Sequence, residues 1–241
     1  MSIKNYNKIV ITGGVGVGKT TTINHLKNIL TENKIKFVSI PEYLDASPIG
    51  ADMLNNYLQG KISAFEFQEY IINYFDKYLS SIELTGDEII LFERVPDDTV
   101  TCFANIWNKQ GKLSDLELFT LYQQTKALNE KYNLPSYFKE SNNNDLIHML
   151  MNTADTKKTA LRIFEEIKNE NYSTKQNKTI IIGLYNTPTE CLERVKNRGR
   201  DEETKNYTIE TIKEFNKHYT NIYNKFMNGE RLRYSEIGSL V

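Results

Sequence analysis

The sequence predicts an α/β fold, a three-layer α/β/α sandwich in which a five-stranded parallel sheet lies between two layers of helices. Four short β-rich runs alternate with longer helical patterns, as is typical of parallel sheets covered on both faces. These runs are KIVITG, KFVSIPE, EIILFER and KTIIIGLY, and LRYSEIG near the C-terminus is the candidate for the fifth strand. At 241 residues the chain is long enough for one well-buried domain, residues 1–241.

The first run leads into a glycine-rich loop and then into a helical pattern at 21–30. The loop has the spacing of a phosphate-binding motif: Gly, four residues, then Gly-Lys-Thr. Backbone N–H groups converge on an anion only where no Cβ intervenes. Lys19 is expected to reach the outer phosphates and Thr20 to offer its hydroxyl to Mg²⁺. The predicted nucleotide-binding residues are Gly13, Gly14, Val15, Gly16, Val17, Gly18, Lys19, Thr20 and Thr21.

The second run leads into SIPEYLD, in which Pro41 marks the end of the predicted strand and Glu42 follows directly. Ligands of parallel sheets bind beyond the carboxyl ends of the strands, which places Glu42 beside the phosphate loop. A carboxylate there can take a proton from a substrate hydroxyl as a general base. The alternative is a solvated loop acid.

The third run ends in Glu93 and Arg94, at the same edge of the predicted sheet. Glu93 can bind Mg²⁺ directly or through water, and Arg94 can orient an attacking oxygen and neutralise a transferred phosphoryl group. The alternative is a structural ion pair. Asp97 and Asp98 are expected to be acids of a first helical turn, where negative charge is favourable.

Residues 139–178 form a polar, loop-like stretch with a helical pattern at 159–167, and we interpret this segment as an insertion. The fourth run follows it and leads to CLERVKNRGRDEET, which carries Arg194, Arg198 and Arg200. A solvated helix face would explain such charges. Gly199 interrupts the helix between two arginines, however, which favours a lid that closes over phosphates.

The composition of the chain indicates which kinds of binding partner to expect. The net charge of −1 calls for neither a nucleic acid nor an anionic membrane, so a small-molecule substrate is the better expectation. The chain has no secretory signal pattern and no apolar stretch of membrane-spanning length, which predicts a cytoplasmic protein. Its two cysteines, Cys102 and Cys191, belong to no metal-binding or disulfide pattern.

Taken together, the phosphate loop, Glu42, the Glu93–Arg94 pair and RGRDEE resemble the deoxyribonucleoside kinases, a family of P-loop kinases that includes cellular enzymes and herpesvirus thymidine kinases. The resemblance implies ATP and Mg²⁺, with Glu42 as the base for the sugar 5′-hydroxyl. The lid arginines would hold the donor phosphates. The residues it implies for nucleoside binding are Tyr57 and Glu203 at the sugar 3′-hydroxyl, Gln68 and Phe103 at the base, and Glu42 and Arg94 at the 5′-oxygen. Homodimers are usual in this family.

Some positions depart from the family pattern. Ser47 stands where members usually carry a tryptophan that lines the nucleoside pocket. Thr99 and Phe75 stand where cytidine- and purine-accepting members have an acid and an arginine. These two residues resemble the thymidine-accepting branch, so a pyrimidine deoxynucleoside is the expected substrate. The open alternatives are a nucleoside monophosphate kinase such as thymidylate kinase, and a nucleotide-binding switch module.

Overall fold

The computed structural model describes residues 7–46, 48–85, 87–138, 146–169 and 178–234. A sheet of parallel strands forms its middle layer, in the order β2-β3-β1-β5-β4. The strands are β1 (Lys8–Gly13), β2 (Phe37–Ile40), β3 (Ile89–Glu93), β4 (Leu146–Asn152) and β5 (Thr179–Tyr185). The first strand is central, with Ile9 in register with Leu91 on one side and Ile180 on the other.

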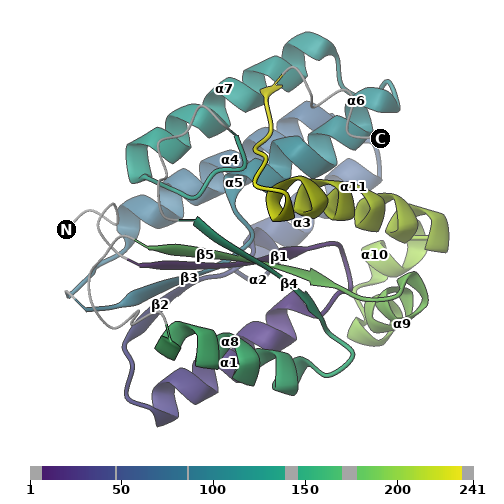
Figure 1. Ribbon diagram of the computed structural model, residues 1–241. Helices are drawn as coiled ribbons and strands as arrows, with labels where there is room; N and C mark the ends of the chain where they lie inside the picture. Colours follow the sequence, from purple (N-terminus) through teal and green to yellow (C-terminus); the bar gives the residue numbers. More distant parts are fainter. Residues whose placement is uncertain (1–6, 47, 86, 139–145, 170–177, 235–241) are drawn as a thin grey trace.

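Helices cover both faces of this sheet, which confirms the predicted three-layer fold (Figure 1). One layer contains α1 (Lys19–Glu32) and α8 (Thr156–Asn169). The opposite layer includes α4 (Ala64–Ser81), α5 (Pro96–Asp98), α7 (Asp115–Tyr132) and α11 (Ile209–Met227). The remaining helical segments are α2 (Tyr43–Ala46), α3 (Pro48–Leu58), the π-helical turn η2 (Thr99–Ala104), α6 (Asn105–Lys109), α9 (Pro188–Arg198) and α10 (Asp201–Asn206).

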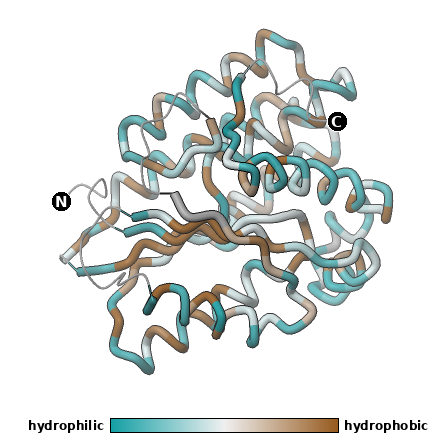
Figure 2. The backbone as a smooth tube through the Cα atoms, viewed as in Figure 1, coloured by the Kyte–Doolittle hydropathy of each residue, from teal (hydrophilic) through white to brown (hydrophobic). Residues whose placement is uncertain are grey.

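The hydropathy of the strands explains their place. Every residue of β1 and β3 is buried, and the sheet forms a hydrophobic band between the helical layers (Figure 2). Strands buried on both faces have continuous apolar sequences because neither face meets water. None of the helices in the described residues is long and apolar enough to cross a membrane.

Local sequence signals set several helix ends. Ser63 and Glu66 form a capping box at the start of α4, in which each side chain binds the other residue's backbone N–H. Ser114 and Glu117 do the same for α7. At the other side of the molecule, α9 ends at Gly199, which has a left-handed φ of 70°. The predicted interruption between the lid arginines is therefore present.

The prediction for the fifth strand was wrong in its position. The fifth strand is β4, which pairs along its length with β5. In LRYSEIG, Leu232 forms only an isolated bridge with Phe138, and residues 235–238 lie outside the described part of the chain. The sequence LIHMLMN lacks the β-branched run that marks the other strands, since an edge strand has fewer neighbours to pack against.

The segment interpreted as an insertion is, in its described part, a piece of the sheet and of one helical layer. Residues 146–169 form β4 and α8, and α8 packs against α1 (Figure 1). The helical pattern predicted at 159–167 lies within α8. The segment therefore completes one edge of the fold rather than adding to it.

Candidate active site

The phosphate loop joins β1 to α1 through glycines that adopt left-handed conformations. Gly16 has a φ of 76° and Gly18 a φ of 98°. A Cβ on Gly16 would lie 2.2 Å from the carbonyl oxygen of Cys191, so this position has no room for a side chain. Lys19 Nζ donates to Gly14 O at 2.9 Å. The loop is thus held tightly against α9, with its lysine folded back over it.

Two oxygen ligands lie next to Lys19. Thr20 Oγ1 donates a hydrogen bond of 2.8 Å to Glu93 Oε1, which joins the start of α1 to the end of β3. Oxygen donors suit Mg²⁺, which usually takes its other ligands from phosphates and water. The described residues contain no cluster of three or more acidic, histidine or cysteine side chains that would hold a metal alone. These two residues therefore fit the predicted role of binding Mg²⁺ together with a nucleotide.

Arg94 occupies the centre of the cleft in an unusual backbone conformation. Its φ is 66°, in the left-handed region that costs a non-glycine residue about 1 kcal/mol or more. The guanidinium forms an ion pair with Glu42, donates to Gly13 O at 3.4 Å, and lies 5.1 Å above the Phe103 ring. These contacts fix a strained residue between the phosphate loop and the second strand.

Charges in this cleft shift one another's protonation. Burial acts to raise the pKa of the Glu42 carboxyl, but Arg94 and Lys19 outweigh it and hold that pKa below its ordinary value. Burial lowers the pKa of Lys19 to about 8. Burial and the charge of Glu42 raise the pKa of Glu93. Glu42 is accordingly an ionised carboxylate surrounded by positively charged side chains.

Arg194, the first of the three lid arginines, forms a direct hydrogen bond with the phosphate loop. Its guanidinium donates to Val17 O at 2.9 Å and to Thr153 O at 2.7 Å. Thr153 also donates to Val17 O. Arg194 therefore braces the back of the loop, in addition to bordering the nucleotide cavity described below.

The other two lid arginines are paired with acids. Arg198 forms an ion pair with Glu203 across the Gly199 break. Arg200 binds Asp45 Oδ1 at 2.5 Å, which links the lid to α2, directly after Glu42. The lid thus lies across the cleft, with its positive charges neutralised by carboxylates that a phosphate group can replace.

Three adjoining cavities follow the carboxyl edge of the sheet. The donor cavity, of about 580 Å³, borders the phosphate loop; its lining includes Gly16, Gly18, Lys19, Thr20, Thr21, Glu93, Arg194, Arg198 and Arg200. The acceptor cavity, of about 640 Å³, is lined by residues that include Tyr57, Gln68, Arg94 and Phe103. A junction cavity of about 30 Å³ shares Lys19 and Arg198 with the first and Arg94 and Phe103 with the second. Glu42, Val15 and Glu203 border this junction.

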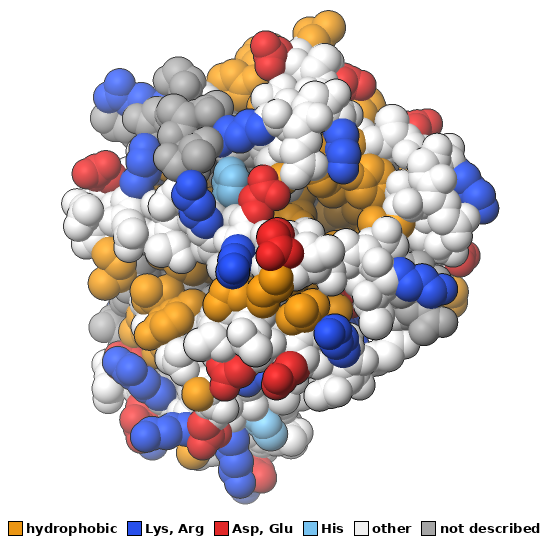
Figure 3. Space-filling model, turned by 90° about the vertical axis from the view of Figure 1, so that its right-hand side faces the viewer, with side chains coloured by type: hydrophobic (Ala, Val, Ile, Leu, Met, Phe, Trp, Pro, Cys, Tyr) orange, Lys and Arg blue, Asp and Glu red, His pale blue; other side chains and the backbone are white. Residues whose placement is uncertain are grey.

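The acceptor cavity combines aromatic walls with one buried amide. Gln68 is only 1% exposed, and neither its amide nitrogen nor its amide oxygen has a hydrogen-bond partner. A buried amide without partners is unfavourable unless a ligand supplies them. A hollow with hydrophobic walls is visible on the face of the molecule that carries the lid (Figure 3). This cavity suits a flat, partly apolar ligand with a polar edge.

The structure brings the predicted residues into one cleft, with a few differences in detail. Gly13 and Gly14 contribute carbonyl oxygens to Arg94 and Lys19, and the Val17 side chain lies in the core. Sequence reasoning missed further lining residues of the acceptor and junction cavities: Tyr43, Phe67, Trp107, Tyr207, Glu214 and Phe215. Tyr43 could have been found because it directly follows Glu42. The others lie on helices or, in the case of Tyr207, directly after one, and the sequence does not mark which side of these segments faces the cavity.

Asp97 and Asp98 fall in the first turn of α5, as predicted, but both are buried. Asp98 accepts hydrogen bonds from Thr12 Oγ1 at 2.7 Å and from Val95 N at 2.9 Å. It therefore ties the strand before the phosphate loop to the backbone next to Arg94. Burial raises the pKa of Asp97 to about 6. These acids support the site from behind, a role that their sequence position alone does not reveal.

Comparison with solved structures agrees with the observed fold. The chain is similar in structure to a deoxyadenosine kinase from M. mycoides solved with bound dATP, with a TM-score of 0.52 and 17% sequence identity over 97% of this chain and 96% of that chain. At this identity the likeness shows a shared fold. The comparison with curated proteins found no match.

A model of the deoxynucleoside kinase family matches residues 9–144. The matched region covers more than half of the 241 residues and contains the phosphate loop, Glu42, Glu93, Arg94 and Gln68. The three cavities give such an enzyme separate places for a phosphate donor and an acceptor. The chain therefore belongs to the deoxynucleoside kinase family and is an ATP-dependent kinase that phosphorylates a nucleoside.

Proposed function

We propose that this kinase transfers the γ-phosphate of ATP to the 5′-hydroxyl of a pyrimidine deoxynucleoside, with thymidine as the favoured substrate. The observation that carries the proposal is the junction cavity, which Lys19 of the phosphate loop and the carboxylate of Glu42 both border. A donor phosphate on one side and a hydroxyl on the other would meet there. Such a junction is what an in-line transfer between two bound molecules requires.

The donor side is built to bind phosphates. Lys19, Arg198 and Arg200 border the donor cavity, and positive charge there stabilises the negative charge that spreads over the phosphoryl oxygens during transfer. Thr20 and Glu93 would hold Mg²⁺. That ion, when bound, supplies further neutralisation of the phosphate oxygens. Binding of ATP would draw Arg198 and Arg200 away from their acidic partners.

On the acceptor side, Glu42 is proposed as the base. Arg94 engages Glu42 Oε1, so Oε2 is the oxygen proposed to accept the proton of the 5′-hydroxyl. A carboxylate with a lowered pKa is a weak base. Phosphoryl transfer has a loose transition state, however, so its rate depends mainly on how the nucleophile is oriented. Arg94 then keeps Glu42 in place and lies next to the group in transfer.

The nucleoside is proposed to lie in the acceptor cavity. Gln68 would pair with the polar edge of the base, Phe103 would stack on it, and Tyr57 and Glu203 would bind the sugar. The residues one turn before and after Gln68 on α4, Ala64 and Ile71, are apolar and line the cavity. Apolar neighbours accommodate the methyl group of thymine, and they offer no charged partner to the amino group of cytosine or adenine.

The proposal predicts ATP-dependent phosphorylation of thymidine by the purified protein with Mg²⁺. An assay of all four deoxynucleosides, with thymidine monophosphate alongside, measures the products by chromatography. Thymidine is expected to give the highest kcat/KM. Turnover of the monophosphate alone would instead identify a nucleoside monophosphate kinase, and a clear preference for a purine would overturn the proposed base. ATP turnover that no nucleoside stimulates would support a switch module.

Glu42→Gln is expected to lower kcat by about 10²- to 10⁴-fold while nucleoside binding is largely kept, because the amide cannot accept the proton. Turnover measurements and calorimetric titration with thymidine separate the two effects. Asp52→Asn is a matched control, since Asp52 is an exposed acid on the neighbouring helix α3. Near-normal turnover of the Glu42 variant would show that another group takes the proton.

We also propose that the enzyme is a homodimer, as the family resemblance implies. Light scattering coupled to size-exclusion chromatography would then give twice the chain mass of 28.0 kDa.

A further inference from the structure

An aromatic wall of the acceptor cavity centres on Trp107, the single tryptophan of the chain. Trp107 lies on α6, one helical turn after Phe103. Its ring centroid is 4.5 Å from that of Tyr57 and 6.0 Å from that of Phe67. The centroid of Phe103 lies 6.4 Å away. One indole therefore connects aromatic side chains from α3, α4 and η2.

This aromatic wall lies next to the residues proposed to bind the nucleobase. Phe67 and the unpartnered Gln68 are consecutive on α4, and both line the cavity together with Trp107 and Phe103. A base that lies on Phe103 and pairs with Gln68 must fit into the space that Trp107 borders. Trp107 itself is 8% exposed, and as a lining residue it presents part of its surface to the cavity.

We propose that Trp107 is a nucleobase-contacting residue that limits the width of the base site. This inference rests on the proposed function, since it requires a deoxynucleoside in the acceptor cavity. Aromatic rings bind bases through stacking and edge contacts that are largely tolerant of base identity. Trp107 thus adds affinity for a planar base, and Gln68 supplies the hydrogen bonds. A purely packing role would give Trp107 an effect on stability without an effect on nucleoside binding.

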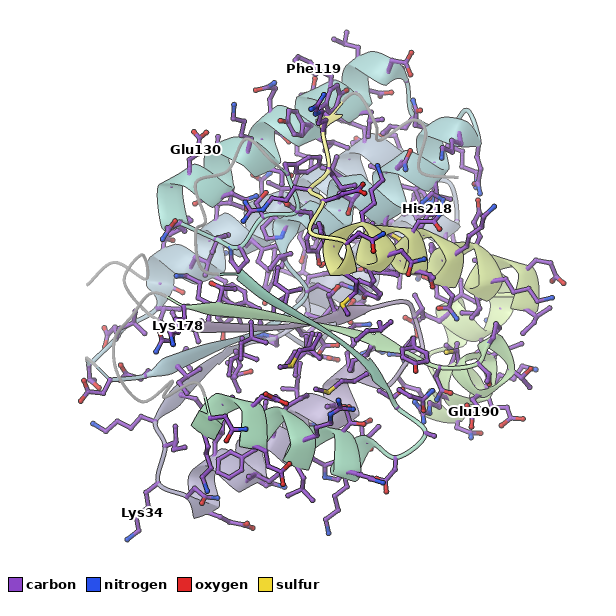
Figure 4. The ribbon with its side chains drawn as sticks, viewed as in Figure 1. Lys34, Phe119, Glu130, Lys178, Glu190 and His218 are labelled. Atoms are coloured by element: carbon purple, nitrogen blue, oxygen red, sulfur yellow. The ribbon has the colours of Figure 1, made fainter. Side chains whose placement is uncertain are left out.

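The first test uses the intrinsic fluorescence of the unmodified protein. Thymidine is titrated without ATP, and a saturable change of tryptophan emission is expected, with a midpoint equal to the Kd measured by calorimetry. The double variant Trp107→Phe with Phe119→Trp is the control. Phe119 lies on α7 at the outer side of its layer and outside the cavity lining (Figure 4). Its tryptophan should report no change at the same occupancy.

The second test separates KM values. Trp107→Leu is expected to raise the KM for thymidine by about ten-fold, which corresponds to the loss of one aromatic contact with a base. The KM for ATP should stay within two-fold. Trp107→Phe keeps an aromatic ring that can contact a base and should recover most of the affinity for thymidine.

The possible outcomes separate a failure of the proposed role of Trp107 from a failure of the proposed function. Thymidine binding by calorimetry with unchanged emission, or a KM for thymidine that Trp107→Leu leaves within two-fold, overturns the role of Trp107 and leaves the kinase proposal intact. Absence of both thymidine binding and phosphorylation in the unmodified protein contradicts both proposals.

Discussion

At the scale of single residues, the cleft depends on buried charges that neutralise one another. Glu42 and Arg94 pair at its centre, and Lys19 lies next to them with only 6% of its surface exposed. Burial disfavours the charged form of a lysine, so Lys19 loses its proton at a lower pH than a lysine in water does. The nucleotide must therefore bind while this lysine still carries its charge.

A pH profile tests this. Because burial lowers the pKa of Lys19 to about 8, kcat/KM for ATP is expected to fall about ten-fold per pH unit above pH 8, where the free enzyme loses the lysine proton. The kcat at saturating ATP should fall only at higher pH, since bound phosphates favour the protonated form. Identical basic limbs in both profiles would assign the limb to another group.

The residue scale also shows which features of the cleft can be inferred from the sequence alone. The phosphate loop, Glu42 and Arg94 follow directly from spacing and from their place after strands. The ion pairs of the lid could not be predicted, because Arg200 and Asp45 are far apart in the chain and meet only when α10 reaches α2. The role of Asp98 was hidden for the same reason.

At the scale of elements, the segment 139–178 is the clearest surprise. Polar, loop-like flanks around a helical pattern suggested an insertion, yet β4 and α8 complete the sheet and one helical layer. Edge strands carry weak sequence signals because few contacts act on each residue. The helical pattern at 159–167 was predicted, but its packing against α1 was not.

The packing of α8 leads to a stability prediction. Ile163 is fully buried, so Ile163→Ala should lower the free energy of unfolding by about 2–5 kcal/mol through lost burial and a residual cavity. Leu161→Ala on the same helix is the control, because Leu161 is 46% exposed and its loss should cost within about 0.5 kcal/mol. Urea unfolding measures both. Equal, small effects would show that α8 is peripheral to the fold.

At the scale of the whole molecule, α11 couples the sheet to both cavities. Its Tyr223 packs on β5 so closely that a Cβ on Gly183 would lie 2.6 Å from the tyrosine ring. The same helix carries Phe215 to the acceptor cavity and Asn216 to the phosphate loop at Gly14. A shift of α11 would therefore reach the donor and acceptor sites together.

Gly183→Ala is expected to lower the free energy of unfolding by about 1–3 kcal/mol, since the added methyl group forces α11 outward. The KM values for ATP and for the nucleoside should both rise. Adding Tyr223→Leu makes room for the methyl group and should restore part of the lost stability. Urea unfolding and steady-state kinetics of the two variants provide the test, and an unaffected single variant would show that the helix adjusts without cost.

The sequence by itself determined the fold class, the phosphate loop and the order of the charged motifs along the cleft. Those features depend on neighbours in the chain, on strand hydropathy and on the rule that parallel strands present their carboxyl ends at one edge. Only the tertiary structure decided which strand closes the sheet, which acids hold the lid arginines and which aromatic residues surround Gln68. These depend on contacts between segments distant in the chain, and Trp107 became a candidate binding residue only when α6 placed it beside Tyr57 and Phe67.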